Sequence, residues 1–181
     1  MRKILLLVMG MSIFSCATPP KGFTYQFKNV NTGLDKLINI DGYYLSEECD
    51  SMYISLFMFY SNGLCRFART EKDGVDYALN SFKDEGKELN PHISWGIYHI
   101  SNDTIFGQFI EDQGIFYGDY SFYTNYKILP NKRVMITSHV NEEGKIVEGN
   151  KCNIVARFYP LEKKRDWKEC PWLKKKWFWK K

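Results

Sequence analysis

The sequence has little of what most catalytic and metal-binding proteins carry. Its 181 residues include three histidines, His92, His99 and His139, which are isolated from one another. It contains no GxSxG or HExxH motif and no glycine-rich phosphate loop, and its cysteines lack the close CxxC spacing of zinc sites. We therefore expect no catalytic residues, no metal ligands and no cofactor, and an enzyme is our third hypothesis, after two kinds of binding protein.

A long apolar run is missing as well. A helix that spans a membrane needs about 20 apolar residues, whereas the run from Ile4 to Phe14 has only eleven and follows Arg2 and Lys3. A charged start followed by an apolar run of this length is typical of a secretion signal. We expect residues 1–15 to be removed when the protein is exported.

The end of this signal carries a recognisable motif. The residues IFSC at 13–16 resemble the lipobox of bacterial lipoproteins, in which a cysteine receives diacylglycerol. The resemblance implies that Cys16 is lipidated and begins the mature protein, with residues 16–22 as a short tether. Ala17 in second place is similar to the pattern of Gram-negative lipoproteins that reach the outer membrane, on its periplasmic or cell-surface face. The alternative is an ordinary secretion signal that happens to contain a cysteine.

The rest of the chain is rich in aromatic residues and poor in helical periodicity. Aromatics make up 17% of the sequence, and the roughly 160 residues after the signal are enough for one domain. Short apolar and aromatic runs alternate with turn residues, which is the pattern of an antiparallel meander. Eight such runs occur, at 37–45, 51–60, 64–70, 92–100, 104–111, 119–129, 133–140 and 151–159. We therefore predict an all-β fold over residues 23–160.

The connections between these runs are of two kinds. Those at 61–63, 101–103 and 130–132 are tight turns, and the others are longer. In a meander the two kinds lie at opposite ends, a closed end with tight turns and an open end with long loops. Eight up-and-down strands with this asymmetry resemble the lipocalin and wider calycin architecture. The resemblance covers most of the mature chain and implies an eight-stranded antiparallel barrel whose ligand cavity opens among the long loops.

Individual residues can be set against this architecture. Gly42-Tyr43-Tyr44 is similar to the family's Gly-x-Trp signature, with tyrosine in place of tryptophan. Period-two alternation predicts three inward faces, and it places Arg157 on an outer face. These faces carry Tyr120, Phe122, Tyr126 and Ile128, then Val134, Ile136 and Val140, then Ile154, Ala156 and Phe158. The candidates for lining a ligand cavity are Trp95, Tyr120, Phe122 and Tyr126.

Four cysteines follow Cys16, an even number that predicts two disulfides in an exported protein. Three connectivities are possible. The strand order places Cys49, in the loop after the first run, and Cys152, at the start of the last run, together at the open end, because these two runs become neighbours when the barrel closes. It places Cys65 and Cys170 at the closed end. We predict the pairs Cys49–Cys152 and Cys65–Cys170.

Two further segments bear on function. Between 71 and 91, apolar residues at helical spacing from Val75 to Phe82 predict a short helix, which is either a lid over the cavity or a connector packed at the rim. The run 51–60 is apolar on both faces, so its outer side must be covered by the N-terminal segment or the C-terminal tail.

The tail, residues 161–181, is basic and aromatic. It holds nine Lys or Arg against three acids, a net charge of about +6, and subtracting this and the two cations of the signal from the total of +4 leaves about −4 for the body. This mixture suits membrane interfaces and anionic headgroups; the alternative is a disordered tail. The residues expected at the membrane surface are Trp172, Lys174, Lys175, Lys176, Trp177 and Trp179.

These features lead to two main hypotheses. The first is a membrane-anchored lipoprotein that binds a small apolar or aromatic ligand in its barrel. The second is an envelope interaction or structural module, or a hydrolase inhibitor, which acts through its loops without a cavity. We expect the partners to be the membrane and a small hydrophobic ligand or an envelope protein, and no nucleic acid. We also expect the lipid, the tight turns and the tail to face the membrane together, because the tether leads into the first strand at the closed end.

Overall fold

The computed structural model describes residues 18–47, 52–83, 93–112, 119–140, 145–149 and 153–180. Cys16, Cys49 and Cys152 lie outside these ranges, and with them the predicted lipidation and the predicted Cys49–Cys152 disulfide. The described residues form nine strands: β1 (Gly42–Glu47), β2 (Tyr53–Phe59), β3 (Leu64–Glu71), β4 (Ile93–Ser101), β5 (Thr104–Asp112), β6 (Asp119–Leu129), β7 (Arg133–Val140), β8 (Ile146–Gly149) and β9 (Val155–Pro160).

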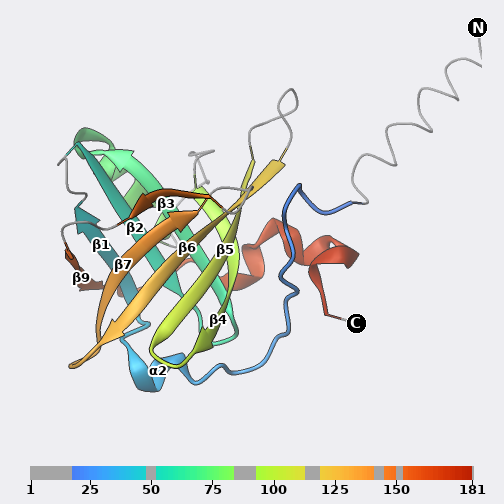
Figure 1. Ribbon diagram of the computed structural model, residues 1–181, viewed down its shortest axis with the longest axis horizontal. Helices are drawn as coiled ribbons and strands as arrows, with labels where there is room; N and C mark the ends of the chain where they lie inside the picture. The colour runs from blue at the N-terminus through green and yellow to red at the C-terminus, as the bar shows by residue number, and fades with distance from the viewer. Residues whose placement is uncertain are drawn as a thin grey trace, which may run out of the picture.

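The strands close into a barrel (Figure 1). They form one antiparallel sheet in the order β6-β5-β4-β3-β2-β1-β9-β7-β8, and β6 also pairs with β7. Because β8 and β9 are successive segments along β7, the closed sheet has eight strands around its circumference. The predicted lipocalin-like, up-and-down β-barrel is confirmed. The predicted runs 119–129 and 133–140 match β6 and β7 in both bounds.

Alternation along the strands builds two apolar groups, one on each side of the sheet. The inner group fills the barrel and includes Phe57, Phe59, Phe109 and Tyr126, all almost completely buried. Their rings touch one another, with centroids 4.7 Å apart for Phe57 and Tyr126 and 5.2 Å apart for Phe59 and Tyr126. This part of the interior is therefore solid aromatic packing.

A short helix closes the barrel at the end with the tight turns. This helix, α2 (Leu34–Leu37), includes Leu37, which we expected in the first strand. Leu34 and the following Ile38 are fully buried in the inner group. The hydroxyl of Tyr44 donates to the carbonyl of Asn39 at 2.8 Å and accepts from its N–H at 3.1 Å. Figure 1 shows α2 beneath the barrel.

The N-terminal segment, residues 18–33, crosses the outside of the barrel before α2 begins (Figure 1). Lys21 pairs with Tyr120 near the open end of β6, and Thr32 donates its N–H to Ser61 in the tight turn between β2 and β3. Gln108, fully buried on the outer face of β5, holds this segment: its Nε2 donates to Gly22 at 2.8 Å. The chain does enter β1 at the closed end, through α2, as expected. The segment before α2 starts beside the open end, however, so our expectation that the tether lies with the tight turns is wrong for residues 18–22.

The C-terminal tail is ordered and covers the same wall. It forms three short 3-10 helices, η2 (Trp167–Glu169), η3 (Pro171–Lys174) and η4 (Lys176–Phe178). Trp172 and Phe178 are buried in the outer apolar group, together with Leu56 and Met58 of β2. β2 is apolar on both faces because the tail covers its outer face, as predicted. The alternative of a disordered tail is excluded for the described residues.

The predicted helix after β3 is present as α3 (Val75–Phe82), preceded by the 3-10 turn η1 (Lys72–Gly74). Ala78 and Phe82 of α3 are fully buried in the outer group. The helix therefore packs against the wall of the barrel rather than forming a lid over its open end.

The predicted Cys65–Cys170 disulfide is not formed. Both residues are buried, but Cys65 belongs to the inner group and Cys170 to the outer group. The strand order placed both at the closed end correctly. It did not show that the pleat of β3 turns the Cys65 side chain into the barrel, while the tail carries Cys170 over the outside.

Candidate functional site

Two of the four predicted lining residues do not line an accessible site. Trp95 points outward from β4, where its ring stacks on Tyr60 with centroids 5.7 Å apart. Tyr126 does face the interior, but it is fully buried in the aromatic packing. The prediction for Trp95 fails because a strand offers two faces and an apolar sequence does not choose between them.

The other two candidates, Tyr120 and Phe122, face the interior near the open end and are half-buried. Phe122 stacks on Phe109 with centroids 5.3 Å apart, and Tyr120 follows it toward the loops. Side chains from the neighbouring strands complete a group that we call the open-end cluster. Its members are Phe67, Ser94, Glu111, Tyr120, Phe122, Thr124 and His139.

The sheet register brings these residues together. Glu111 of β5 lies opposite Tyr120, whose hydroxyl donates to its Oε2 at 2.6 Å. Thr124 of β6 lies opposite His139, with 3.0 Å between the hydroxyl and Nδ1. The His139 ring also contacts Phe67, with centroids 5.4 Å apart. The cluster therefore combines aromatic rings with hydrogen-bonding groups.

Ser94 is the member of the cluster that points most directly to a ligand. It lies opposite Phe67 in the β3–β4 ladder and so shares its inward direction. Only 1% of Ser94 is exposed, yet its hydroxyl has no hydrogen-bond partner among the described residues. A buried hydroxyl without a partner costs roughly 1–3 kcal/mol. A bound group that hydrogen-bonds Ser94 would recover part of that cost.

Sequence reasoning missed most of this cluster. The alternation predicted Val140 on the inner face of β7, but a bulge opposite Asn125 and Tyr126 shifts the register. Beyond the bulge His139, rather than Val140, faces inward beside Thr124. Bulges of this kind leave no reliable trace in the apolar pattern. Ser94 and Glu111 carry no aromatic ring, so the aromatic pattern that predicted the lining residues does not include them.

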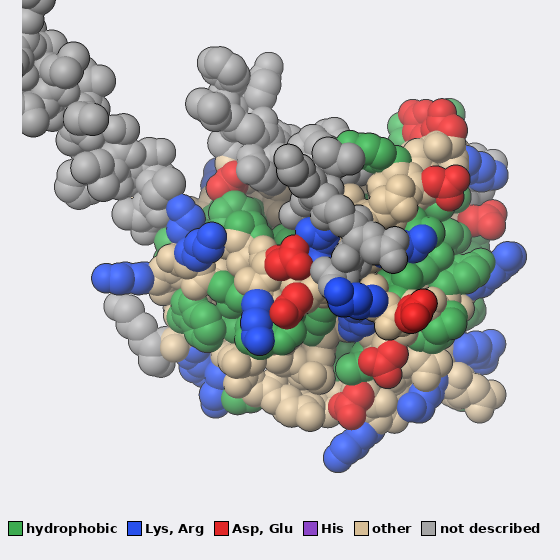
Figure 2. Space-filling view, turned by 180° about the vertical axis from the view of Figure 1, so that it is seen from behind, with side chains coloured by type: hydrophobic (Ala, Val, Ile, Leu, Met, Phe, Trp, Pro, Cys, Tyr) green, Lys and Arg blue, Asp and Glu red, His purple; other side chains and the backbone are tan. Residues whose placement is uncertain are grey.

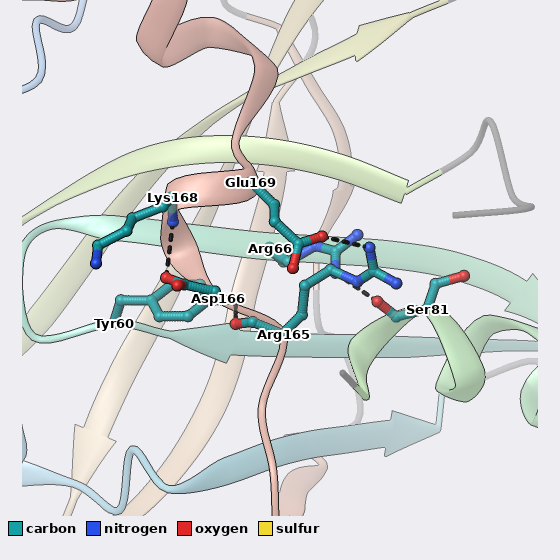
Figure 3. Close-up of polar contacts among 7 residues, drawn as sticks. All are labelled: Tyr60, Arg66, Ser81, Arg165, Asp166, Lys168 and Glu169. Atoms are coloured by element: carbon teal, nitrogen blue, oxygen red, sulfur yellow. Dashed lines mark hydrogen bonds and ion pairs between the residues drawn. The ribbon is translucent and has the colours of Figure 1, made fainter. Parts of the chain in front are cut away.

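A second polar group lies on the outer wall and is structural (Figure 3). The guanidinium of the fully buried Arg66 donates to the carbonyl of Ser81 in α3 and lies 4.6 Å from the centre of the Trp95 ring. Arg165 of the tail bonds Glu169 at 2.7 Å, and its carbonyl accepts from the hydroxyl of Tyr60 at 2.8 Å. These contacts fasten α3 and the tail to the barrel.

The closed end has a shallow pocket of about 260 Å³ beside α2. Asp35, Asp41 and Lys132 line it and are exposed. Nearby, Lys164 is largely buried and donates from Nζ to the carbonyls of Ile40 at 2.6 Å and Phe59 at 2.8 Å. Burial lowers the pKa of Lys164 to about 8, against a smaller opposing effect of Asp41. The exposed charges are solvated, so this pocket is a weaker candidate than the open-end cluster.

The described residues contain no metal-binding cluster and no membrane-spanning helix, and comparison with known proteins adds no other site. Within the described ranges, no group of three or more His, Cys, Asp or Glu is placed to hold a metal ion. No helix in that part of the chain is long and apolar enough to cross a membrane. Comparison of the chain with protein-family models, with curated proteins and with solved structures found no match.

Proposed function

We propose that this protein is an outer-membrane lipoprotein, anchored through Cys16, that binds a small aromatic ligand at the open-end cluster. The observation that carries the proposal is the buried hydroxyl of Ser94, which has no hydrogen-bond partner among the described residues and lies beside the aromatic rings of Phe67 and Phe122. Aromatic rings with a few convergent polar groups are the usual composition of a small-molecule site.

The packing of the barrel restricts the ligand. Below the cluster the interior is filled by Phe57, Phe59 and Tyr126, so a long acyl chain cannot extend toward the closed end. Within the cluster Glu111 accepts a hydrogen bond from Tyr120, and His139 and the hydroxyl of Ser94 are further polar groups. The ligand that fits is compact, with one or two aromatic rings and a hydrogen-bonding group at one end.

Fluorescence titration with 1-naphthylamine, a compact amine with two fused aromatic rings, tests this site. We expect saturable binding with one site per chain. Phe122→Ala should weaken it about tenfold, since an aromatic contact contributes roughly 0.5–1.5 kcal/mol beyond its buried area. The matched control is Phe106→Ala, because Phe106 is also half-buried but faces outward from β5 against His99. Equal effects of the two variants, or no saturable binding, would favour the interaction module instead.

Ser94→Ala separates binding from folding in the same experiment. Removing a buried hydroxyl that has no partner in the described part of the chain should raise the free energy of unfolding by about 1 kcal/mol in urea titrations without ligand. Ligands that hydrogen-bond Ser94 should bind this variant more weakly. A variant that is both less stable and unchanged in binding contradicts the assigned role of this hydroxyl.

A further inference from the structure

The two ends of the described chain pack against each other on the outer wall. Phe27 pairs with Trp179 in a parallel bridge, its N–H donates to Phe178 at 2.6 Å and its carbonyl accepts from Lys180 at 2.8 Å. Phe23 stacks on Phe178 with ring centroids 6.0 Å apart and contacts Trp177 at 5.6 Å. Residues 18–33 and 170–180 therefore form one continuous surface.

This surface carries positive charge only. Neither segment contains Asp or Glu, and together they contain six lysines. We call it the lysine surface; its charged residues are Lys21, Lys28, Lys174, Lys175, Lys176 and Lys180, of which all but the half-buried Lys175 are exposed. Figure 2 shows Lys and Arg side chains gathered at the left edge of the molecule, the side on which the two segments lie. The aromatic residues of the tail mostly face the barrel, so lysines make up most of the solvent-exposed surface of these two segments.

The lysine surface also lies close to the predicted lipid. Thr18 follows Cys16 by two residues, which span at most about 7 Å. The expected free tether is largely absent, because Pro20 is buried and its carbonyl accepts from the N–H of Phe23 at 3.0 Å. A lipid on Cys16 would therefore hold this wall, rather than the closed end, within a few ångströms of the bilayer.

We propose that the lysine surface docks on an anionic lipid bilayer, so that the barrel lies on its side with its open end directed along the membrane. This orientation rests on the proposed function, in which a lipid on Cys16 holds the lysine surface near the bilayer. Anionic headgroups attract basic residues within a Debye length, about 10 Å at moderate salt. Trp179, which is 36% exposed and donates from its indole N–H to Leu173 at 2.9 Å, adds an amphipathic ring at the headgroup level.

The charge elsewhere on the barrel argues against the other orientations. The rim of the open end carries Glu47, Glu71, Asp73 and Asp119 in exposed positions, and these would be repelled by anionic lipid. The closed end exposes Lys36, Lys132 and Arg133 beside Asp35 and Asp41, so its charge is mixed. An upright barrel would therefore present carboxylates or a mixture of both charges to the bilayer, whereas the lysine surface presents lysines alone.

Vesicle co-sedimentation of the chain from Ala17, which keeps every residue of the described fold and carries no lipid, tests the proposal. We expect it to bind phosphatidylcholine vesicles that contain phosphatidylglycerol, and to be released at high salt. Each lysine near an anionic surface contributes about fivefold in affinity. The triple variant Lys174→Glu, Lys176→Glu, Lys180→Glu should therefore bind roughly a hundredfold more weakly or not at all.

A second triple variant supplies the matched control. Lys36→Glu, Lys72→Glu, Lys127→Glu changes the net charge equally at exposed positions away from the lysine surface, and it should retain binding. Equal losses in the two variants, equal binding to vesicles of phosphatidylcholine alone, or no binding by the parent chain would overturn the proposal. Near-ultraviolet circular dichroism checks that both variants are folded. The mass of the N-terminal peptide of the exported protein tests the lipid on Cys16 separately.

Discussion

Lys164 shows how one buried side chain affects the stability of this protein. Its ammonium group satisfies the carbonyls of Ile40 and Phe59 and lies 4.5 Å from the centre of the Tyr60 ring. Burial nevertheless disfavours the charge, so that the pKa falls from 10.5 to about 8. Between these two values the unfolded chain binds more protons than the folded one, and stability must therefore rise with pH.

We predict that the free energy of unfolding increases by about 2 kcal/mol between about pH 7 and about pH 9.5 through this residue. Urea titrations across that range should show the rise in the parent chain and lack it in Lys164→Met. The buried tyrosines act in the opposite sense at higher pH, since burial raises the pKa of Tyr25 to about 12 and favours the protonated form. Lys127→Met, at an exposed lysine, should retain the rise, and a flat profile in the parent would contradict the assignment.

The strand elements show which parts of the fold the sequence could predict. The bounds of β6 and β7 follow from alternation and from the tight turn between them, both of which are local patterns. The inward position of His139 depends on a bulge, and the outward position of Trp95 depends on the choice of face. Neither is encoded within a few residues. The path of residues 18–33 could not be predicted either, because that segment has no periodicity and is held by distant partners such as Gln108.

The turn between β6 and β7 supports a prediction at this scale. Asn131 and Lys132 both have positive φ, 61° and 58°, as in the type I′ turns that suit hairpins. Asparagine tolerates this conformation, whereas lysine is strained in it by roughly 1 kcal/mol. Lys132→Gly should therefore raise the free energy of unfolding by about 0.5–1 kcal/mol, measured in urea.

The comparison for this turn is Lys127→Gly, a glycine introduced at an exposed position inside β6. That variant should be less stable than the parent, because glycine weakens a strand interior. If Lys132→Gly is destabilised to the same extent, the strain assigned to Lys132 is wrong.

At the scale of the whole molecule, the closed barrel predicts the disulfide that lies outside the described residues. The β1–β9 ladder places Leu45 opposite Arg157. In the sequence Cys49 comes four residues after Leu45, and Cys152 comes five residues before Arg157. If the antiparallel register of this ladder continues past the described residues, the two cysteines approach each other. We predict a Cys49–Cys152 disulfide and no bond between Cys65 and Cys170, whose side chains lie on opposite faces of the sheet.

Non-reducing peptide mapping of the exported protein checks this pairing. A linked peptide that contains positions 49 and 152 is the expected product. A link between 65 and 170 would mean that the tail, or the face of β3, is arranged differently from the structure. Reduction should lower the free energy of unfolding by about 2–4 kcal/mol, since the bond closes a loop of roughly 100 residues.

The contact between Phe27 and Trp179 has a consequence for the order in which the molecule is made. These residues are about 150 positions apart in the sequence, yet they pack against each other on the outer wall of the folded barrel. Gln108 of β5 can hold the N-terminal segment once the barrel forms, but Phe23 and Phe27 are covered only when the last described residues are in place. Contacts at this separation are also slow to form. A chain that lacks residues 176–180 would lose the rings that cover Phe23 and Phe27, and apolar surface would be exposed on the outer wall.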